Sequence, residues 1–514
     1  MSMKWLLRQA ILWHRYLGIC FCLFFAIWFV SGVVLMYAGM PQLSEADRLA
    51  HLPALDLSSE RVSPAEALEM SGASEHPEQI VIGMFGNRPV YRVLTEFGSW
   101  VTIFADDGKP LDGVDGAAAI EIASQYGGTT APEIRASGEI SQPDQWTVYP
   151  GSESYFPFLK LTANDRRGTE YYVSEATASV YLETSRRSRF LAWCGAIPHW
   201  WYVRALRSRA NLWSDVMIGA SGWGILLCVA GIVAGLLRFS PSSRYRFPER
   251  RYSAVPYAGW KRWHYLLAMG FGLVTFTWIF SGLMTMDPGD WSPGPDPSGA
   301  EVRTFAGGDL DPGLFRVTPA EAAGRLRGCI RPVEIEMMLF RGRPYYLAKG
   351  RKAEVQLLSA EPGAGTCIAE VPADELLAAS QKVAGGAPIV EEARLGAYDA
   401  YYYDRDREKP LPVLRIRFAD PRRTWLYLNP RTGLIAARYT NRSRLERWLY
   451  SGLHDLDFPF LYWHRPAWDL TVIGLSIGGL ALSLTSVVLA LKYLRRQYRR
   501  RAMALWARAG REAS

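Results

Sequence analysis

Residues 13–37 read WHRYLGICFCLFFAIWFVSGVVLMY, and residues 263–286 read WHYLLAMGFGLVTFTWIFSGLMTM. Both stretches open on Trp-His, and both place a Ser-Gly pair 17 residues after the histidine. Neither contains an acidic side chain, and each is long enough to cross a hydrocarbon core of about 30 Å as a helix. The sequence therefore predicts an integral membrane protein in which one helical unit is written twice.

The correspondence extends beyond these two stretches. Ser63-Pro64-Ala65-Glu66-Ala67 matches Thr318-Pro319-Ala320-Glu321-Ala322 at an offset of 255 residues, against 250 for the membrane stretches. At the same offset of 255, His199 falls on His454. A repeat of this length predicts two structural units packed against each other, with a ligand site between them.

Four charge-free runs have the length of a membrane-spanning helix, and they are Tyr16–Tyr37, Val216–Leu237, His264–Met286 and Leu470–Leu491. The first run is too long for the apolar core of a signal peptide, so we expect it to be an uncleaved anchor. The predicted organisation is 1–38, N-terminus and first membrane helix; 39–212, first exported domain; 213–237, second helix; 238–263, loop; 264–286, third helix; 287–467, second exported domain; 468–491, fourth helix; and 492–514, basic tail.

The distribution of charge predicts the orientation. Residues 1–15, 238–263 and 492–514 together carry 18 basic and 2 acidic side chains, whereas the rest of the chain carries 40 and 48. Because basic loops stay in the cytoplasm, both termini are expected there, with the two large domains outside. The net charge of +8 is thus a signal of topology, with membrane lipid as the expected partner of the basic segments and no nucleic acid.

Each exported domain shows the pattern of an α+β fold. The two matching Ser/Thr-Pro-Ala-Glu segments have the cap, the proline and the glutamate of a helix start. In the first domain, strand-like runs at Ile80–Met84 and Val90–Leu94 flank the turn Gly86-Asn87-Arg88-Pro89. These features predict an antiparallel sheet with helices, and segments 288–313 and 404–412, rich in Pro, Gly and charge, are predicted to be loops.

Only two of the six cysteines suggest a pair. Cys329 and Cys367 lie in the second exported domain, where an oxidising compartment would allow a disulfide, and the sequence leaves open whether they form one. No CxxC or CxxCH motif occurs, so neither covalent attachment of haem nor a clustered zinc site is expected.

The segment Gly86-Asn87-Arg88-Pro89-Val90-Tyr91, with the turn Asp106-Asp107-Gly108, resembles the core of a PepSY domain. Flanked by helices bearing Trp13–Gly18 and Trp28–Gly32, it is similar to the PepSY-associated transmembrane family of bacterial inner-membrane proteins. The resemblance implies an integral membrane α-helical protein, with four transmembrane helices as two tandem repeats and two periplasmic α+β PepSY-like domains. It also implies two b-type haems and, as in some members, reduction of ferric siderophores.

The positions of four of the seven histidines point to the same cofactor. His14 and His264 each open an outward-going helix at the cytoplasmic end, while His199 and His454 precede the returning helices by equal intervals at the outer end. A b-type haem held by two histidines needs both imidazoles at one membrane depth. Two such pairs predict two haems, with these four histidines as axial ligands of the haem iron.

Three further residues are candidates near these sites. His464, beside Arg465-Pro466, is a possible substitute for His454, and Arg15 and Arg204 are possible partners of the propionates. The competing interpretation is that any one histidine is an interfacial residue, since imidazole sits comfortably beside tryptophan at a membrane surface. No side chain is singled out as catalytic.

The cytoplasmic segments total about 60 residues, too few for a nucleotide-binding fold, and no GxGxxG follows a strand. Electrons are therefore expected from a membrane quinol, a reduced flavin or a partner reductase. The predicted function is a haem-dependent membrane reductase that passes electrons to a periplasmic acceptor, which the resemblance suggests is a ferric siderophore. The alternative is a non-enzymatic PepSY-type protein that binds peptide or restrains a protease.

Overall fold

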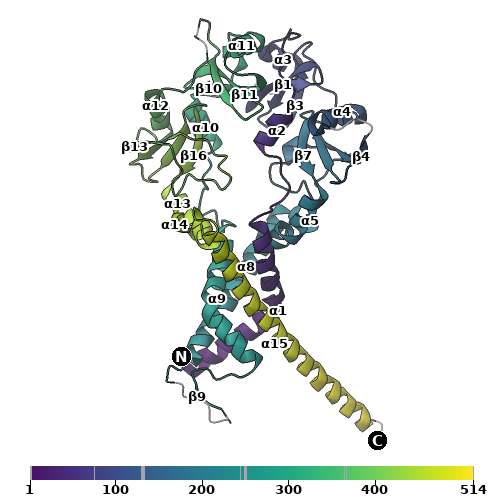
Figure 1. Cartoon of the computed structure of the whole chain (residues 1–514), viewed down its shortest axis with the longest axis vertical. Helices are drawn as coiled ribbons and strands as arrows, with labels where there is room; N and C mark the ends of the chain where they lie inside the picture. The colour runs from purple at the N-terminus through teal and green to yellow at the C-terminus, as the bar shows by residue number, and fades with distance from the viewer. Residues whose placement is uncertain are drawn as a thin grey trace. The chain divides into compact units, whose positions relative to one another are not determined.

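The computed structural model describes residues 3–73, 76–128, 133–242, 245–247, 252–363, 365 and 367–512, with side chains up to Ala504. The chain forms two compact units (Figure 1). The helical unit comprises Met1–Gly39, Leu191–Ser292 and Leu445–Ser514. The sheet unit comprises Met40–Phe190, its first half, and Pro293–Arg444, its second half.

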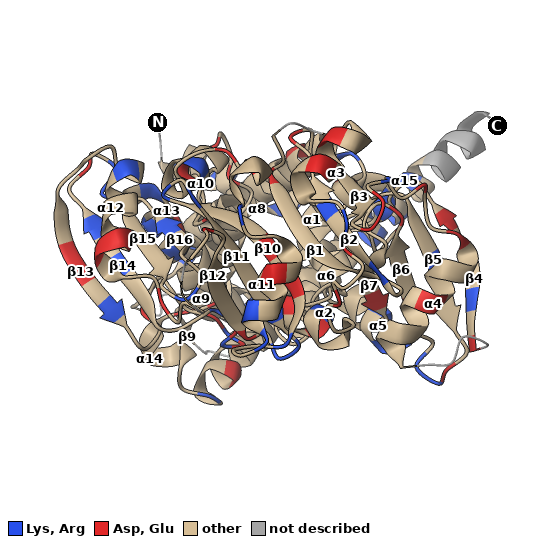
Figure 2. Ribbon diagram, turned by 90° about the horizontal axis from the view of Figure 1, so that it is seen from above, with Lys and Arg blue, Asp and Glu red and all other residues tan. Residues whose placement is uncertain are grey.

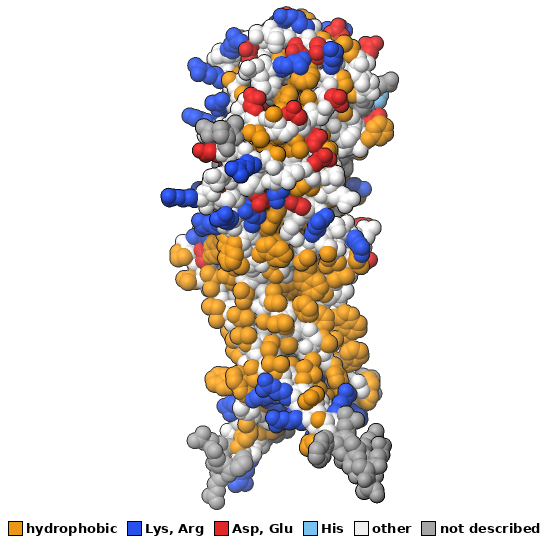
Figure 3. Space-filling view, turned by 90° about the vertical axis from the view of Figure 1, so that its right-hand side faces the viewer, with side chains coloured by type: hydrophobic (Ala, Val, Ile, Leu, Met, Phe, Trp, Pro, Cys, Tyr) orange, Lys and Arg blue, Asp and Glu red, His pale blue; other side chains and the backbone are white. Residues whose placement is uncertain are grey.

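Four long helices build the helical unit, and they are α1 (Met3–Leu35), α8 (Ala210–Arg238), α9 (Trp260–Met284) and α15 (Ala467–Glu512). All four are long and apolar enough to cross a membrane. Neighbouring pairs are α1 with α8, α8 with α9, α9 with α15, and α15 with α1, so α1 and α9 face each other diagonally. Figure 3 shows the resulting apolar surface, with basic side chains at one end. The chain is therefore a multi-pass membrane protein.

Two ends of this bundle are distinguished below. At the basic end, α1 and α9 begin and α8 finishes, and a hairpin of β8 (Tyr245–Arg246) and β9 (Tyr252–Ser253) follows α8. At the loop end, α1 and α9 finish and α8 and α15 begin. Short helices lie at the loop end, and they are α5 (Arg186–Cys194), α6 (Ala196–Trp200), α7 (Arg204–Arg207), α13 (Asn441–Arg447), the π-helical turn η4 (Trp448–Gly452) and α14 (Pro459–Tyr462).

The helical unit is larger than the sequence indicates. Residues 191–212 and 445–467, assigned above to the exported domains, belong to it, because α6 packs on α1 and η4 packs on α9. The last helix also continues through the basic segment to Glu512 instead of ending at residue 491. Charged residues do not interrupt it because Arg and Lys are good helix formers.

Among the described residues, the sheet unit contains three antiparallel sheets. The largest has the order β12-β11-β10-β1-β2-β3, and the others have the orders β4-β5-β6-β7 and β13-β14-β15-β16. The strands of the first half are β1 (Gln79–Phe85), β2 (Arg88–Leu94), β3 (Trp100–Phe104), β4 (Ile134–Ile140), β5 (Phe158–Ala163), β6 (Glu170–Ser174) and β7 (Ser179–Thr184). Those of the second half are β10 (Pro332–Phe340), β11 (Arg343–Gly350), β12 (Val355–Ser359), β13 (Ile389–Leu395), β14 (Val413–Phe418), β15 (Trp425–Asn429) and β16 (Leu434–Tyr439).

Helices cover these sheets in both halves. They are α2 (Glu45–His51), α3 (Pro64–Ser71), α4 (Gly116–Gly127), α10 (Gly299–Ala306), α11 (Pro319–Leu326) and α12 (Ala373–Val383), with single 3-10 turns η2 (Glu153–Tyr155) and η3 (Pro312–Leu314). Both α3 and α11 begin with a capping box and a proline in the first turn, as predicted. The loop predicted over 288–313 is wrong, because α10 lies inside it and starts with a capping box of Ser298 and Glu301.

The six-stranded sheet joins the two halves. Strand β1 pairs with β10 so that Ile80 lies opposite Met337 and Ile82 lies opposite Ile335. In the sequence correspondence, Ile80 matches Ile335 and Ile82 matches Met337, so the pairing is reciprocal about its centre. Buried residues of both halves, including Tyr91 and Ile335, form one core under this sheet. The two domains expected from the sequence are thus joined in a single compact unit.

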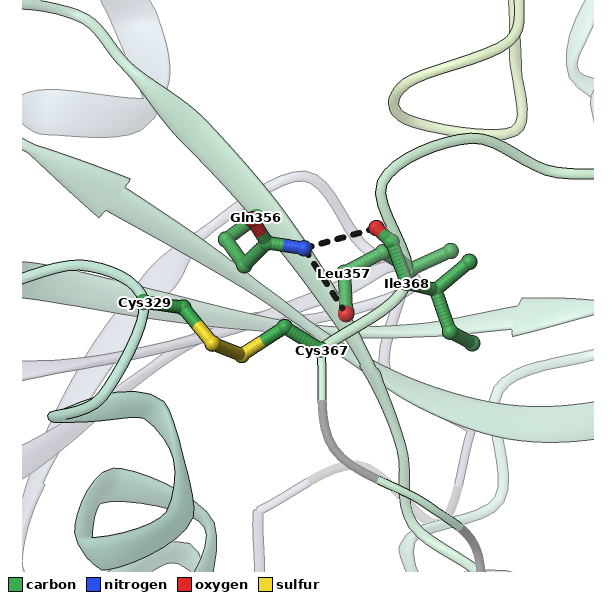
Figure 4. Close-up of a disulfide and its surroundings, with 5 residues drawn as sticks. All are labelled: Cys329, Gln356, Leu357, Cys367 and Ile368. Atoms are coloured by element: carbon green, nitrogen blue, oxygen red, sulfur yellow. Dashed lines mark hydrogen bonds between the residues drawn. A yellow bond between two sulfur atoms is a disulfide. The ribbon is translucent and has the colours of Figure 1, made fainter.

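A disulfide links Cys329, which follows α11, to Cys367, which follows β12 (Figure 4). Next to it the Gln356 side-chain amide donates a hydrogen bond to the carbonyl oxygen of Ile368 at 2.7 Å. The pairing that the sequence left open is therefore present in the sheet unit. The free cysteines all lie in the helical unit, and they are Cys20, Cys22, Cys194 and Cys228.

Candidate functional site: two histidine pairs

The four histidines singled out by the sequence lie in the helical unit as two pairs. His14 of α1 and His264 of α9 face each other across the diagonal of the bundle, with their ring centroids 5.9 Å apart. His199 of α6 and His454, just after η4, have their ring centroids 6.0 Å apart. Each pair joins one histidine from the first matching segment to one from the second.

The two pairs lie at different depths. His14 is near the basic end of α1, while His199 packs beside Ser31 and Gly32, near the loop end of the same helix. Seventeen residues of α-helix between His14 and Ser31 span about 25 Å, close to the thickness of a hydrocarbon core. We call them the basic-end pair and the loop-end pair.

Hydrogen bonds fix the tautomer at the loop-end pair. The Nδ1 atom of His199 lies 3.2 Å from Ser31 Oγ, and Nδ1 of His454 lies 3.0 Å from Ser281 Oγ. Both serine hydroxyls donate their proton to a carbonyl one turn earlier in their own helix, at Trp28 and at Trp278. With each hydroxyl proton directed to that carbonyl, the imidazole Nδ1 is the donor in the contact with serine, and Nδ1 of His454 also lies 3.2 Å from the Trp278 carbonyl oxygen, which can only accept.

The basic-end pair carries its proton on the same atom. Nδ1 of His14 lies 3.2 Å from the Leu227 carbonyl oxygen, which can only accept. Nδ1 of His264 lies 3.1 Å from Thr485 Oγ1, and that hydroxyl donates to the Leu482 carbonyl at 2.7 Å. Both rings are therefore Nδ1–H donors.

This arrangement leaves the Nε2 lone pair free at all four rings. The hydrogen bonds that the four imidazoles make to the described residues all involve Nδ1. An imidazole whose Nδ1–H is held by a carbonyl or hydroxyl is oriented and made more basic at Nε2, which is the usual state of a metal-binding histidine. Two metal–nitrogen bonds of about 2.0 Å, plus the distance from each nitrogen to the centroid of its own ring, give a centroid separation of about 6 Å, close to both observed separations.

A pair of histidine ligands suits the iron of a haem better than a metal ion that is bound by the protein alone. In the described part of the chain, no group of three or more His, Cys, Asp or Glu side chains could hold a metal ion. Haem iron takes four of its ligands from the macrocycle and needs only two from the protein. The paired imidazoles therefore fit the cofactor that the sequence predicts.

Glycines allow the rings to pack directly on helix backbone. A Cβ atom added at Gly231 of α8 would lie 2.6 Å from Cε1 of His14, which is too close for any side chain. At Gly32 a Cβ would lie 3.2 Å from Cε1 of His199, and at Gly282 it would lie 3.6 Å from Cε1 of His454. The two Ser-Gly pairs of the sequence thus form the seats of the loop-end histidines.

A cavity of about 310 Å³ adjoins the basic-end pair. All four long helices line it, with mostly apolar side chains, and its walls include Gly18, Phe25, Leu227, Met269 and Leu482. Volumes of a few hundred Å³ with apolar walls and a few polar groups are typical of cofactor sites. The cavity therefore places ligand-sized space beside His14 and His264.

The loop-end rings are partly buried, and this has two chemical consequences. Burial lowers the pKa of both His199 and His454, and the neighbouring ring lowers that of His199 further, so both rings are neutral at pH 7. Nearby, the buried indole N–H groups of Trp28 and Trp278 have no hydrogen-bond acceptor among the described residues. Buried donors are normally satisfied, so these two equivalent groups suit an acceptor on a bound ligand.

The other predicted residues are exposed. His464 is exposed beyond α14, so His454 and not His464 faces His199. Arg15 and Arg204 are both exposed, and the Arg15 guanidinium lies 5.8 Å from the ring centroid of Tyr493. Their role toward propionates stays a prediction.

Sequence reasoning missed two groups around the basic-end pair. Thr485 and Gly231 contact the rings of His264 and His14 respectively, and neither lies in a recognisable motif. The offset of 255 residues offers a signal, because Gly231 falls on Ser486, whose hydroxyl lies 3.4 Å from Nδ1 of His264. The matched positions on α8 and α15 therefore face equivalent histidines.

These features define a class of membrane protein, a four-helix bundle with one partly buried histidine pair toward each end. The family model of the PepSY-associated TM region matches residues 11–325, more than half of the sequence, and the chain belongs to this family. The matched segment contains His14, His199 and His264. Comparison with curated proteins and with solved structures gives no match.

Proposed function

We propose that the protein is a di-haem b transmembrane oxidoreductase made of two tandem repeats. The observation that carries the proposal is the state of the four imidazoles. Each has Nδ1 engaged by a helix acceptor, and the rings form two pairs about 6 Å apart. Support for the repeats comes from the strand bounds, since β4 to β7 recur as β13 to β16 with every bound shifted by 255 residues.

The residues have separate tasks in this proposal. His14 and His264 would hold one haem, and His199 and His454 the other. Bound haem supplies one-electron chemistry between ferric and ferrous iron. Trp28 and Trp278 would donate to acceptor groups of the ligand, and the packed apolar helices would exclude water.

We further propose that the chain lies in a bacterial inner membrane, with both termini cytoplasmic and the sheet unit periplasmic. Two observations support this orientation. The basic segments are those at the ends of the chain and between α8 and α9. The disulfide Cys329–Cys367 lies in the sheet unit, while the free thiols lie in the helical unit, as expected if the sheet unit faces an oxidising compartment.

The proposed acceptor is a ferric siderophore, bound on the side of the sheet unit, whose two halves would each be one PepSY-like domain. Reduction to Fe(II) weakens the hold of hard oxygen ligands on iron, so electron delivery would release the metal for uptake. A membrane quinol, a reduced flavin or a partner reductase would supply the electrons.

An absorption spectrum tests the cofactor assignment. The protein purified in mild detergent should contain two haems, with low-spin spectra of bis-histidine ligation in the oxidised and dithionite-reduced forms. A haem content near zero would contradict the proposal and favour a PepSY-type protein that binds peptide or restrains a protease.

A sided assay tests the direction of electron transfer. Liposomes containing the protein would receive reductant at the face with the basic segments, and reduction of a ferric siderophore would be followed at the other face. The wild type should carry electrons outward, and His14→Ala should block this transfer. Transfer only in the inward direction would contradict the reductase function while leaving the haem sites unaffected.

A further inference from the structure

One matched position in the sheet unit differs sharply between the halves. In the first half, the carboxylate of Glu170 on β6 pairs with Lys160 at 2.8 Å and with Arg189 at 3.5 Å. At the offset of 255 residues, Glu170 falls on Trp425, while Lys160 and Arg189 fall on Arg415 and Arg444. The second half therefore keeps the cations and replaces their central carboxylate with an indole.

Three guanidinium groups surround this indole, and we call the group the Trp425 cluster. Their central carbons lie 3.9 Å (Arg417), 4.4 Å (Arg444) and 5.6 Å (Arg415) from a Trp425 ring centroid. Tyr401 meets the same indole edge-on at 5.1 Å. Cation–π contacts hold guanidinium groups on an aromatic face without neutralising their charge.

The nearby carboxylates neutralise only part of the positive charge of these guanidinium groups. Arg415 pairs with Glu391 and Asp399, and Arg417 pairs with Glu391. Arg444 donates to the Arg423 carbonyl oxygen at 2.8 Å and has no carboxylate partner among the described residues. The cluster thus contains three cations against two carboxylates.

The surroundings make this excess positive charge unfavourable in the absence of a ligand. Burial is the main cause that lowers the pKa of Arg444; Tyr401 and Tyr427 oppose it, and the positive charges of Arg417 and Arg423 reinforce it. Arg422 and Arg423 are exposed beside the cluster, and the ribbon around β14, β15 and β16 carries several basic segments in Figure 2. An anion placed against Arg444 would therefore be stabilised by several cations at once.

We propose that the Trp425 cluster binds an anionic, aromatic iron chelate of the catecholate class. Guanidinium groups pair with anionic oxygens in a planar fork and also stack on aromatic rings, and this ligand class offers both features. An uncharged hydroxamate chelate offers neither. The identity of the metal cargo rests on the proposed function, whereas the binding of the anion does not.

The test uses the full chain in detergent and gallium(III) complexes, which resist reduction. Titrations would compare gallium tris-catecholate with gallium citrate, which is anionic but not aromatic, and with a neutral gallium hydroxamate. We expect the catecholate complex to bind most tightly and the hydroxamate most weakly. Equal affinity for the catecholate and hydroxamate complexes would overturn the proposal, and tightest binding of citrate would overturn its aromatic part.

Variants locate the site. Trp425→Glu restores the carboxylate of the first half and should abolish binding of the catecholate complex, and Arg444→Gln should weaken it about tenfold. Arg394→Gln is the matched control, because Arg394 is an exposed arginine of β13 paired with Glu370, and it should leave the affinity within about twofold. Undiminished binding by Trp425→Glu would refute the site. Haem content, measured on the same samples, distinguishes failure of this inference from failure of the reductase function.

Discussion

The basic-end and loop-end histidine pairs have nearly equal ring separations, 5.9 Å and 6.0 Å, on differently built supports. His14 and His264 belong to the long helices α1 and α9, so the bundle itself positions them. His199 and His454 come from short segments that pack on the Ser-Gly pairs of those helices. The two pairs thus reach almost the same ring separation from different supporting segments. The separation therefore does not depend on one particular helix contact.

The two histidine pairs also differ in the symmetry of their hydrogen-bond partners. At the loop end both rings donate to a serine at equivalent positions. At the basic end, His14 donates to the Leu227 carbonyl and packs on Gly231, while His264 donates to Thr485. One pair is thus symmetric in its side-chain partners and the other is not.

The largest expected effect comes from removing a ring. His14→Ala or His264→Ala should remove the basic-end haem and leave the loop-end spectrum, and His199→Ala or His454→Ala should do the reverse, because each iron loses one of its two protein ligands. The measurement is haem per protein, which should fall from two to one. Loss of both haems in every variant, with the fold intact, would show that the pairs are not independent.

A smaller, graded effect is expected from alanine at the glycine seats. Gly231→Ala should deplete the basic-end haem most, Gly32→Ala should deplete the loop-end haem less, and Gly282→Ala should have the least effect, because the added Cβ would lie 2.6, 3.2 and 3.6 Å from the facing ring. Haem content of the three variants measures this order. An inverted order would mean that the rings move away from these seats when the cofactor binds.

Removing a hydroxyl acceptor should change the potential rather than the haem content. Ser31→Ala and Thr485→Val each take away an acceptor of an Nδ1–H group, at a cost of about 1 kcal/mol, and the weakened imidazole should raise the midpoint potential of its own haem. Redox titration of each haem is the measurement. Thr471→Val is the control, because Thr471 lies in the same helix as Thr485 but its hydroxyl bonds to the Ala467 carbonyl and not to a histidine, and it should not change either potential.

The smallest effect should follow from His464→Ala. This side chain is exposed, so its loss should leave both haems in place, whereas His454→Ala empties the loop-end site. Spectra of the two variants side by side provide the comparison. Loss of the loop-end haem in His464→Ala would show that His464, and not His454, is the ligand of that haem.

The sequence indicated the membrane helices and the depth of each histidine, because apolar runs and their spacing are local signals. It also revealed the helix starts at Ser63 and Thr318, whose caps are read within four residues. It could not reveal that Leu227 accepts from His14, since every residue has a carbonyl oxygen and only packing selects one. The pairing of β1 with β10 could not be predicted for a related reason, because a strand can pair with a partner that is distant in the sequence.

The reciprocal register of β1 and β10 also constrains how the protein can be divided. A chain that ends before residue 332 lacks β10 and leaves the backbone donors and acceptors of one edge of β1 without a partner. Because the pairing is reciprocal about its centre, a second copy of β1 has the geometry to occupy the missing place. A fragment of this chain that contains β1 but not β10 would accordingly need a second copy of itself to complete this part of the sheet.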